Sequence, residues 1–499
     1  MAANPMVTYI CKRTVVSTKP VQPGKRHSLS VLDRAMGENH LKMVYYLKDT
    51  TTPDKYYEPG EITKMLRESI SETLTFFPII TGRLVKEEDG RTWMVKCNDA
   101  GVRMVEARAQ GSVDEWLSNV DREREMKLVH WEEMFHKPYF WSTFYVQLTE
   151  FEGGGVAIGL SCYHLLADPV CATMFIKAWA DIAFLGKMQH PPFFHGLPAP
   201  KLIHNPSLPH ISKTNDLIEH YKATINKSVA NVDQDVELAS HLTTLSFSFT
   251  SSMVQSCMAM ARTGSMQASP FEALSGLFWV CLSKVKKDGD GLLDMSVCLD
   301  ARKALGLDSG FFGNCMVQNR VRCSNHEPLS ISSLASAVAS IREASGEIMD
   351  SNSVMGLIEW LRCKDLDNDD DEDQKKSSPS PINHGDCEIV CIGLDGVDPY
   401  SARFEDGLEP IRVSTYVEPA ASEKWQVLIL PAPPASVGGG YQSGQLDRVV
   451  MVTIPKEFVE SLCRNEIIRD LRPEIVMGPE IVMGTNDAVA SSPNCRVAV

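Results

Sequence analysis

The stretch Val156–Phe184, VAIGLSCYHLLADPVCATMFIKAWADIAF, decides the fold because an apolar strand runs directly into a helical pattern. His164 follows the strand at once and lies in the turn between the two elements. Asp168 followed by Pro169 predicts a helix N-cap and a first helical residue. Apolar residues then recur at helical spacing, at Met174, Phe175, Ala178, Trp179 and Ile182. The sequence therefore predicts a strand-turn-helix unit with a histidine in its turn.

A histidine in such a turn is a candidate general base. Catalytic groups are commonly presented at the ends of buried strands. An unperturbed histidine has a pKa near 6.5, so it can accept a proton from an alcohol or an amine at neutral pH. The HxxxD pattern itself is not specific, because with 13 histidines in the chain a match arises by chance in roughly half of such sequences. On the pattern alone, a structural histidine in a turn stays the alternative.

The segments before this unit alternate between strand and helix patterns. Residues 61–77 carry apolar side chains on one helix face, at Ile62, Met65, Leu66, Ile70 and Leu74. Two β-rich runs, 144–151 and 156–162, flank Gly153–Gly155 and predict a hairpin. Mixed strands and helices of this kind predict an α/β protein.

Length and proline content predict two domains. The 499 residues exceed the size at which single cores stop growing, about 250 to 300 residues. Six prolines fall within residues 188–215, so we place a crossover linker at 188–235. The N-terminal domain is then 1–187, the C-terminal domain 236–465 and the tail 466–499. In the second domain, Ser269-Pro270-Phe271-Glu272 is a capping box that predicts the start of a helix.

Composition excludes several classes of function. The 49 basic and 64 acidic residues give a net charge of −15, which repels nucleic acid at long range. The 14 cysteines form no CxxC pair, so we expect neither a metal site nor a disulfide framework. We find no signal peptide and no run of 18 apolar residues, which predicts a cytoplasmic protein without a transmembrane segment. The acidic residues 364–386 predict a disordered loop, with a regulatory or docking segment as the alternative.

Further stretches match a known family in order along the whole chain. They are residues 29–34 (LSVLDR), 66–84 (LRESISETLTFFPIITGRL), 97–102 (CNDAGV), 146–168 (VQLTEFEGGGVAIGLSCYHLLAD), 300–302 (DAR) and 310–314 (GFFGN). The chain thereby resembles the plant BAHD, or HXXXD-type, acyltransferase family. The resemblance implies a two-domain, CoA-dependent acyltransferase fold of mixed sheets flanked by helices, with a channel at the domain interface. It also implies acyl-CoA as co-substrate, a small-molecule acceptor, no metal and a monomer.

The resemblance assigns roles to three residues. His164 corresponds to the general base, which acyl-CoA reaches from one side and the acceptor from the other. Asp168 corresponds to an aspartate that points away from the site and pairs with an arginine matching Arg302. We therefore expect Asp168 and Arg302 to support the motif structurally.

Two departures from the family pattern bear on function. Pro169 replaces the usual glycine. The C-terminal DFGWG motif corresponds to Arg403-Phe404-Glu405-Asp406-Gly407, in which arginine and aspartate replace the motif's first aspartate and its tryptophan. Because an indole donor at this motif has been considered an oxyanion partner, Asp406 makes acyl transfer less secure.

The altered motif resembles the eceriferum and glossy branch of cuticular wax formation. Two functions follow as expectations. One is acyl transfer from CoA to an alcohol or amine. The other is a non-catalytic accessory role with a fatty acid elongase condensing enzyme, which promotes very-long-chain elongation and holds the protein at the endoplasmic reticulum through that partner.

Overall fold

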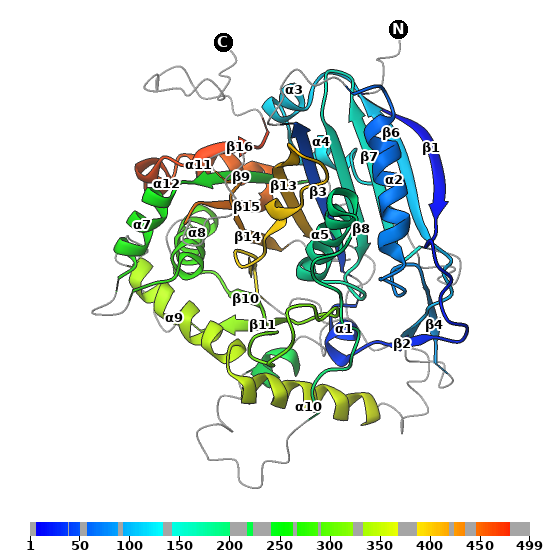
Figure 1. Cartoon of the computed structure of the whole chain (residues 1–499). Coiled ribbons are helices and arrows are strands. Elements are labelled where there is room, and N and C mark those ends of the chain that lie inside the picture. The colour runs from blue at the N-terminus through cyan, green and yellow to red at the C-terminus, as the bar shows by residue number, and fades with distance from the viewer. Residues whose placement is uncertain are drawn as a thin grey trace.

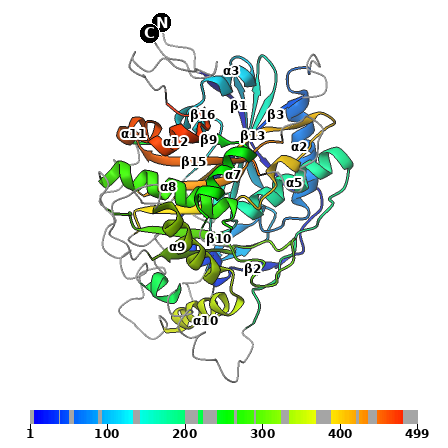
Figure 2. The ribbon, with the colours of Figure 1, turned by 90° about the vertical axis from the view of Figure 1, so that its left-hand side faces the viewer.

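The computed structural model describes residues 6–37, 39–49, 57–87, 93–132, 142–199, 217–222, 241–262, 267–287, 291–322, 333–367, 387–418, 424–434 and 446–479. Two β-sheets with their helices lie beside each other (Figures 1 and 2). The arrangement is the mixed α/β class that the sequence predicts.

The first sheet contains six strands in the described part of the chain. In spatial order they are β1 (Val7–Val15), β6 (Val102–Ala109), β7 (Phe144–Phe151), β8 (Val156–Tyr163), β3 (His40–Asp49) and β13 (Leu408–Glu418). The predicted hairpin is confirmed, because β7 and β8 pair antiparallel with Phe144 opposite Cys162. The helices α2 (Glu61–Leu74) and α5 (Pro169–Leu185) pack together over this sheet, where the Trp179 indole donates to the Leu66 carbonyl at 3.1 Å.

The second sheet contains seven strands among the described residues. In spatial order they are β11 (Met316–Val321), β10 (Met295–Asp300), β12 (Ile389–Gly393), β14 (Trp425–Pro431), β15 (Arg448–Pro455), β9 (Leu242–Phe249) and β16 (Glu474–Met477). Its covering helices include α7 (Ser251–Met260), α8 (Pro270–Lys287) and α9 (Ser333–Ile348). The predicted capping box is confirmed, since Ser269 Oγ accepts from the Glu272 amide and the Glu272 carboxylate accepts from the Ser269 amide. A helix therefore starts where the local sequence supplies both capping groups.

The remaining described elements are short or peripheral. A small sheet joins β2 (Arg26–Ser28), β5 (Trp93–Lys96) and β4 (Arg83–Lys86). The helices are α1 (Val31–Ala35), α3 (Val113–Ser118), α4 (Arg122–Met126), α10 (Ser351–Asp367), α11 (Val459–Cys463) and α12 (Glu466–Leu471), with the 3-10 turns η4 (Pro399–Ser401) and η5 (Lys456–Phe458). In the described part of the chain, we find no helix with the length and apolarity to cross a membrane.

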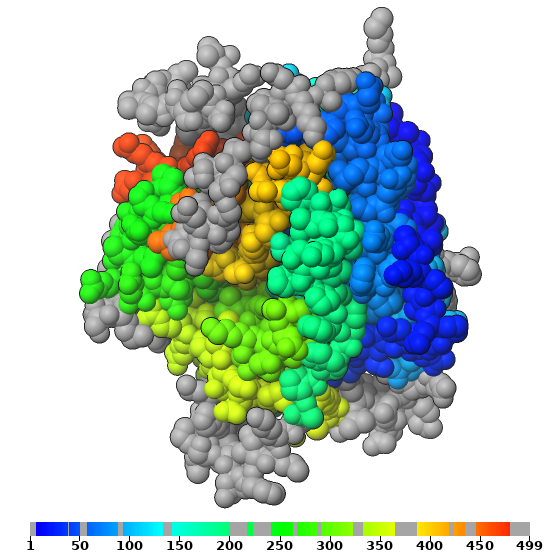
Figure 3. All heavy atoms as spheres, viewed as in Figure 1, coloured from blue at the N-terminus to red at the C-terminus, as the bar shows by residue number. Residues whose placement is uncertain are grey.

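Two elements cross from one half of the chain to the core of the other. The strand β13 lies between β12 and β14 in the sequence, yet it pairs antiparallel with β3 in the first sheet. In the space-filling view, the yellow-orange segment that leads into β13 and includes η4 lies beside the green α5 on the molecular surface (Figure 3). In the opposite direction, Val31, Leu32 and Ala35 of α1 are buried in the second core. A domain boundary at residues 188–235 therefore places β13 and α1 in the domain whose core they do not join.

The C-terminal residues also differ from the predicted tail. Residues 466–471 form α12, whose Ile467 and Ile468 are buried in the second core, and β16 pairs antiparallel with β9. The four residues of β16, EIVM, do not alternate between polar and apolar side chains, so the sequence pattern does not signal a strand. Of the acidic loop predicted at 364–386, residues 364–367 end α10 and residues 368–386 lie outside the described residues.

Candidate active site

The turn that carries His164 is fixed by backbone hydrogen bonds. The His164 amide donates to the Asn39 carbonyl at 2.8 Å, and the Leu166 amide donates to the Tyr163 carbonyl at 3.0 Å. Strand β8 thus ends in a turn, and α5 begins at Pro169, six residues after the last residue of the strand. Asp168 is the N-cap as predicted, since its carboxylate accepts from the Cys171 amide at 2.9 Å. Pro169 occupies the first helical position, where its missing N–H would have no intrahelical partner, so the departure from glycine suits this helix.

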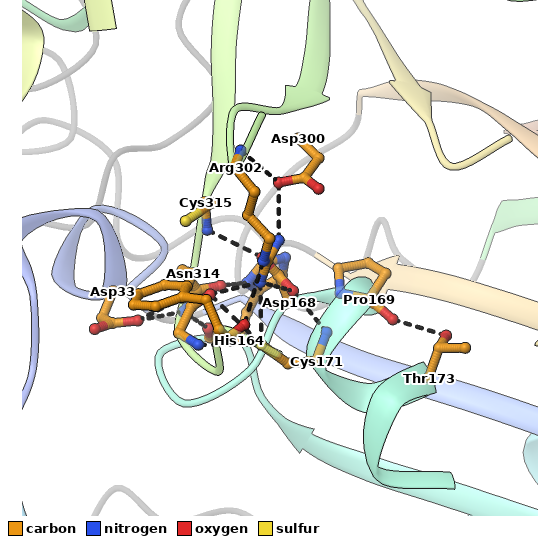
Figure 4. Close-up of polar contacts among 12 residues, drawn as sticks. Asp33, His164, Asp168, Pro169, Cys171, Thr173, Asp300, Arg302, Asn314 and Cys315 are labelled. Atoms are coloured by element: carbon orange, nitrogen blue, oxygen red, sulfur yellow. Dashed lines mark hydrogen bonds and ion pairs between the residues drawn. The ribbon is translucent and has the colours of Figure 1, made fainter. Parts of the chain in front are cut away.

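The imidazole of His164 is oriented by Asn314, in the turn between β10 and β11 (Figure 4). The Asn314 amide nitrogen donates to the His164 carbonyl at 2.6 Å and to Asp33 Oδ1 at 3.0 Å. Its oxygen therefore faces His164 Nδ1, at 2.9 Å. An oxygen acceptor at this position requires Nδ1 to carry the proton. The arrangement selects the tautomer in which Nε2 is the proton-accepting nitrogen.

Asp33 anchors Asn314 from the N-terminal end of the chain. Its Oδ2 accepts from the Ser30 amide at 2.7 Å in a capping box that starts α1. Its Oδ1 accepts from both the backbone and the side-chain amide of Asn314, at 2.8 and 3.0 Å. Each oxygen thus has its own task, one in the helix cap and the other in the site. Neither Asp33 nor Asn314 was predicted as a site residue, although both lie within stretches that carry the family resemblance.

The predicted ion pair between Asp168 and Arg302 is present. Arg302 Nη2 lies 2.9 Å from one Asp168 oxygen and 3.0 Å from the other. The same nitrogen donates to the Gly313 carbonyl at 2.6 Å, while Nη1 donates to Asp300 at 2.8 Å. Asp168 also accepts from the Cys315 amide at 3.0 Å. Asp168 thereby joins the start of α5 to the turn that carries Asn314.

The pKa values of His164 and Asp168 are both lowered, for different reasons. His164 is 2% exposed, and this burial lowers its pKa below the ordinary 6.5, with the nearby Asp168 charge opposing the shift in part. For Asp168, burial alone would raise the pKa. The Arg302 charge and the amides of Cys171 and Cys315 outweigh that effect and hold the pKa below its usual value. At neutral pH the site therefore combines a neutral imidazole with an ionised, paired carboxylate.

The segment Arg403–Gly407 lies along the far half of α5. The buried Phe404 ring contacts the Trp179 ring edge to face, with 5.3 Å between centroids, and the Arg403 guanidinium lies 5.9 Å from the Phe184 ring. Trp179 is 11 residues after the N-cap, about 16 Å along the helix axis. Gly407 has a φ of +82°, which suits the tight turn into β13. This position does not support a direct contact between Asp406 and an acyl group beside His164.

The described residues contain no group of three or more histidine, cysteine, aspartate or glutamate side chains arranged to hold a metal ion. Cys171, three residues after Asp168, has its thiol against Gly313, with 3.2 Å from the Gly313 nitrogen to the sulfur. Burial raises the pKa of this thiol well above its ordinary value. Cys171 therefore packs as a neutral side chain in the motif.

Comparison with known proteins identifies the family. A model described as the Transferase family matches residues 5–379. The chain belongs to this family. Its members are the BAHD acyltransferases that the sequence stretches resemble, and the two-domain α/β architecture is the one that the family predicts.

Individual BAHD relatives are similar over parts of the chain. Protein ECERIFERUM 26-like of Arabidopsis thaliana is 30% identical over 281 residues, which cover 55% of this chain and 60% of that relative. A hydroxycinnamoyltransferase of Narcissus pseudonarcissus is 28% identical over 314 residues, with 62% of this chain and 69% of that relative covered. The match thus spans about 60% of the length of the first of these relatives.

A solved structure supports the fold over a longer range. The crystal structure of F. graminearum TRI101 complexed with coenzyme A and T-2 mycotoxin has a TM-score of 0.59 and 14% sequence identity. The match covers 91% of this chain and 100% of that one. At this identity the likeness concerns the BAHD fold.

Proposed function

We propose that this chain is an acyl-CoA-dependent acyltransferase in which His164 is the general base. The observation that carries the proposal is the hydrogen bond from His164 Nδ1 to Asn314, because it reserves Nε2 for proton transfer. The lowered pKa of the buried imidazole keeps Nε2 unprotonated at neutral pH. A general base must be neutral before it can accept a proton. The orientation of the imidazole and the direction of its pKa shift therefore both support His164 as the base.

The reaction would proceed by addition and elimination. His164 Nε2 takes the proton of an alcohol or amine while the acceptor oxygen or nitrogen attacks the thioester carbonyl carbon. When the tetrahedral intermediate collapses, the carbon–sulfur bond breaks and the departing CoA thiolate accepts from Nε2 the proton that the acceptor gave up. Asp168 and Arg302 act as positioning residues, since their ion pair fixes the start of α5, just after the His164 turn, against the segment that carries Asn314.

Coenzyme A as the acyl carrier is part of the same proposal. The TRI101 structure, which shares the fold, contains coenzyme A. The hydroxycinnamoyltransferase relative is named for an acyl transfer. The net charge of −15 opposes an anionic thioester at long range, so binding would depend on local basic groups.

The test is transfer from a panel of acyl-CoA donors to alcohol and amine acceptors, followed by release of free CoA thiol. We expect wild type to release thiol only with acceptor present and His164→Ala to lose about 100-fold or more in rate. The Asp294→Asn variant, altered at an exposed ion pair, should retain the wild-type rate. Equal rates for wild type and His164→Ala with a good donor and acceptor pair would exclude His164 as the base.

A second function is favoured by the likeness to an ECERIFERUM protein and by the altered Arg403–Gly407 segment. In this alternative the chain assists a fatty acid elongase condensing enzyme without transferring an acyl group. Yeast that expresses a plant condensing enzyme provides the test, with wild type, His164→Ala or no added protein. Longer acyl chains with wild type and His164→Ala alike would support the accessory role, whereas an unchanged acyl profile with both would remove it.

A further inference from the structure

A cavity of about 340 Å³ lies between the two sheets, next to α3. One wall consists of α3 and residues 411–414 of β13, and the other of β9, β15 and the short strand β16. The elements of both sheets therefore build it together. The apolar part of its lining includes Leu117, Ile411, Met451 and Ile475.

Two residues of this lining, Arg412 and Ser246, each have a buried side-chain atom without a hydrogen-bond partner among the described residues, Nη2 and Oγ respectively. Ser246 is 1% exposed. The guanidinium is held in place, because Arg412 Nη1 donates to the Val476 carbonyl at 2.7 Å. A buried polar group without a partner costs about 1 to 3 kcal/mol, and more when the group is charged. Because both residues line one cavity, a ligand or a water molecule bound there can complete these hydrogen bonds.

The two groups define the chemistry of that molecule. A guanidinium can only donate hydrogen bonds, and a serine hydroxyl can donate one, so the ligand must supply acceptors. A carboxylate has two acceptor oxygens and the charge that complements arginine. The hydroxyl of Ser414, also in the lining, already donates to the Glu125 carboxylate at 2.8 Å and does not compete.

The acidic groups of the lining limit the charge of the ligand. Asp114 is exposed and paired with Lys48, and Glu474 is exposed. These carboxylates oppose a second negative charge on the ligand, although water screens them. The volume lies at the lower end of the 300 to 1,000 Å³ that is usual for ligand pockets, so the body attached to the carboxylate is small.

The cavity lies at a distance from His164. Along β3, Arg412 stands opposite Tyr46, whereas His40 stands opposite Tyr163, the neighbour of His164. Six residues of strand separate these two pairs, about 20 Å. A small molecule at Arg412 therefore does not reach the imidazole.

We propose that this cavity is a second ligand site, which binds a small apolar monocarboxylic acid through Arg412 and Ser246. The site extends beyond acyl transfer and does not depend on it. Because β16 forms part of the cavity wall, residues 474–476 near the C-terminus then belong to a binding site.

Calorimetric titration of the full chain with hexanoate tests the proposal, with 1-hexanol as the matched ligand that lacks the carboxylate. We expect saturable hexanoate binding, weakened about 10-fold or more by Arg412→Met and several-fold by Ser246→Ala. The control Arg320→Met alters an exposed arginine and should bind as wild type does. His164→Ala should also bind as wild type.

Three outcomes would overturn the proposal. The absence of saturable binding to wild type means that the cavity holds water only. Equal affinity for hexanol removes the role of the carboxylate, and loss of binding in His164→Ala places hexanoate in the transfer site. If Arg412→Met fails to fold, methyl NMR of wild type decides. Hexanoate should shift Met451 in the cavity and leave Met295, buried in the second core, unshifted.

Discussion

At the scale of single residues, the tautomer of His164 follows from one amide. We predict that Asn314→Leu removes the preference for a proton on Nδ1, because no acceptor then faces that nitrogen. Nitrogen-15 NMR of labelled histidine should show the Nδ1–H tautomer in wild type and a mixture in the variant. The rate of acyl transfer should fall about 10-fold or more.

A matched variant separates this effect from a general loss of stability. Asn319→Leu also removes a buried amide, one that donates to the Ala344 carbonyl and to Glu347. Each variant should lower the free energy of unfolding by about 1 to 3 kcal/mol. An unchanged His164 tautomer in Asn314→Leu would refute the orienting role.

Buried histidines predict that acid destabilises the fold. Burial lowers the pKa of His40 to about 4 and lowers that of His164 as well. Between pH 6.5 and about 4 the unfolded chain binds protons at these sites while the folded chain does not, so stability falls as pH falls. We expect His40→Gln to reduce the loss of unfolding free energy between pH 7 and pH 5 by about 1 to 2 kcal/mol. Urea unfolding at both pH values measures it, and an identical loss in wild type and His40→Gln would contradict the assignment.

The Asp168–Arg302 pair predicts an asymmetry between breaking and replacing it. Asp168→Asn removes the charge that faces Arg302 Nη2 and leaves this guanidinium, which is 6% exposed, with Asp300 as its remaining carboxylate partner, so it should cost about 3 to 5 kcal/mol. Asp168→Asn combined with Arg302→Met should cost less than the sum of the single changes. Denaturant unfolding measures the cycle. In the exposed pair, Asp294→Asn should cost at most about 1 kcal/mol, and additivity at Asp168 and Arg302 would argue against a coupled pair.

At the scale of elements, the capping box of α8 should contribute measurably to stability. Ser269→Ala removes the acceptor of the Glu272 amide and should lower the unfolding free energy by about 1 kcal/mol. At the start of α7, Thr250 makes no side-chain cap hydrogen bond. Thr250→Ala should therefore lower the unfolding free energy by only roughly a few tenths of a kcal/mol. Equal losses in the two variants, measured by denaturant unfolding, would show that the cap at Ser269 is not the cause.

Elements were predictable from the sequence where their determinants are local. The helix face of α2, the β7–β8 hairpin and the Asp168 cap all depend on residues within one or two turns of chain. Contacts over long separations were not visible in such patterns. The pairing of Asp168 with Arg302 was predicted by family resemblance alone. The hydrogen bond from Asn314 to Asp33, 281 residues apart, has no periodicity that could signal it.

At the scale of the whole molecule, the same long separations argue for one cooperative unit. The first sheet needs β13 from the C-terminal half, and the second core needs α1 from the N-terminal end. The motif adds a third link, because Asp168 and His164 from the first half bind Arg302 and Asn314 from the second. Neither half can therefore unfold without breaking contacts that the other half requires.

Amide hydrogen exchange can test this coupling with reciprocal variants. Ile429→Ala in β14 and Val146→Ala in β7 each truncate a fully buried side chain, and each should cost about 2 to 4 kcal/mol. In a single unit, Ile429→Ala lowers the protection of β7 amides by the same factor as that of β14 amides, and Val146→Ala does the converse. If each variant lowers protection only in its own sheet, the halves open independently. Since the motif residues are divided between the halves, His164 would then lose its Asn314 partner whenever either half opened.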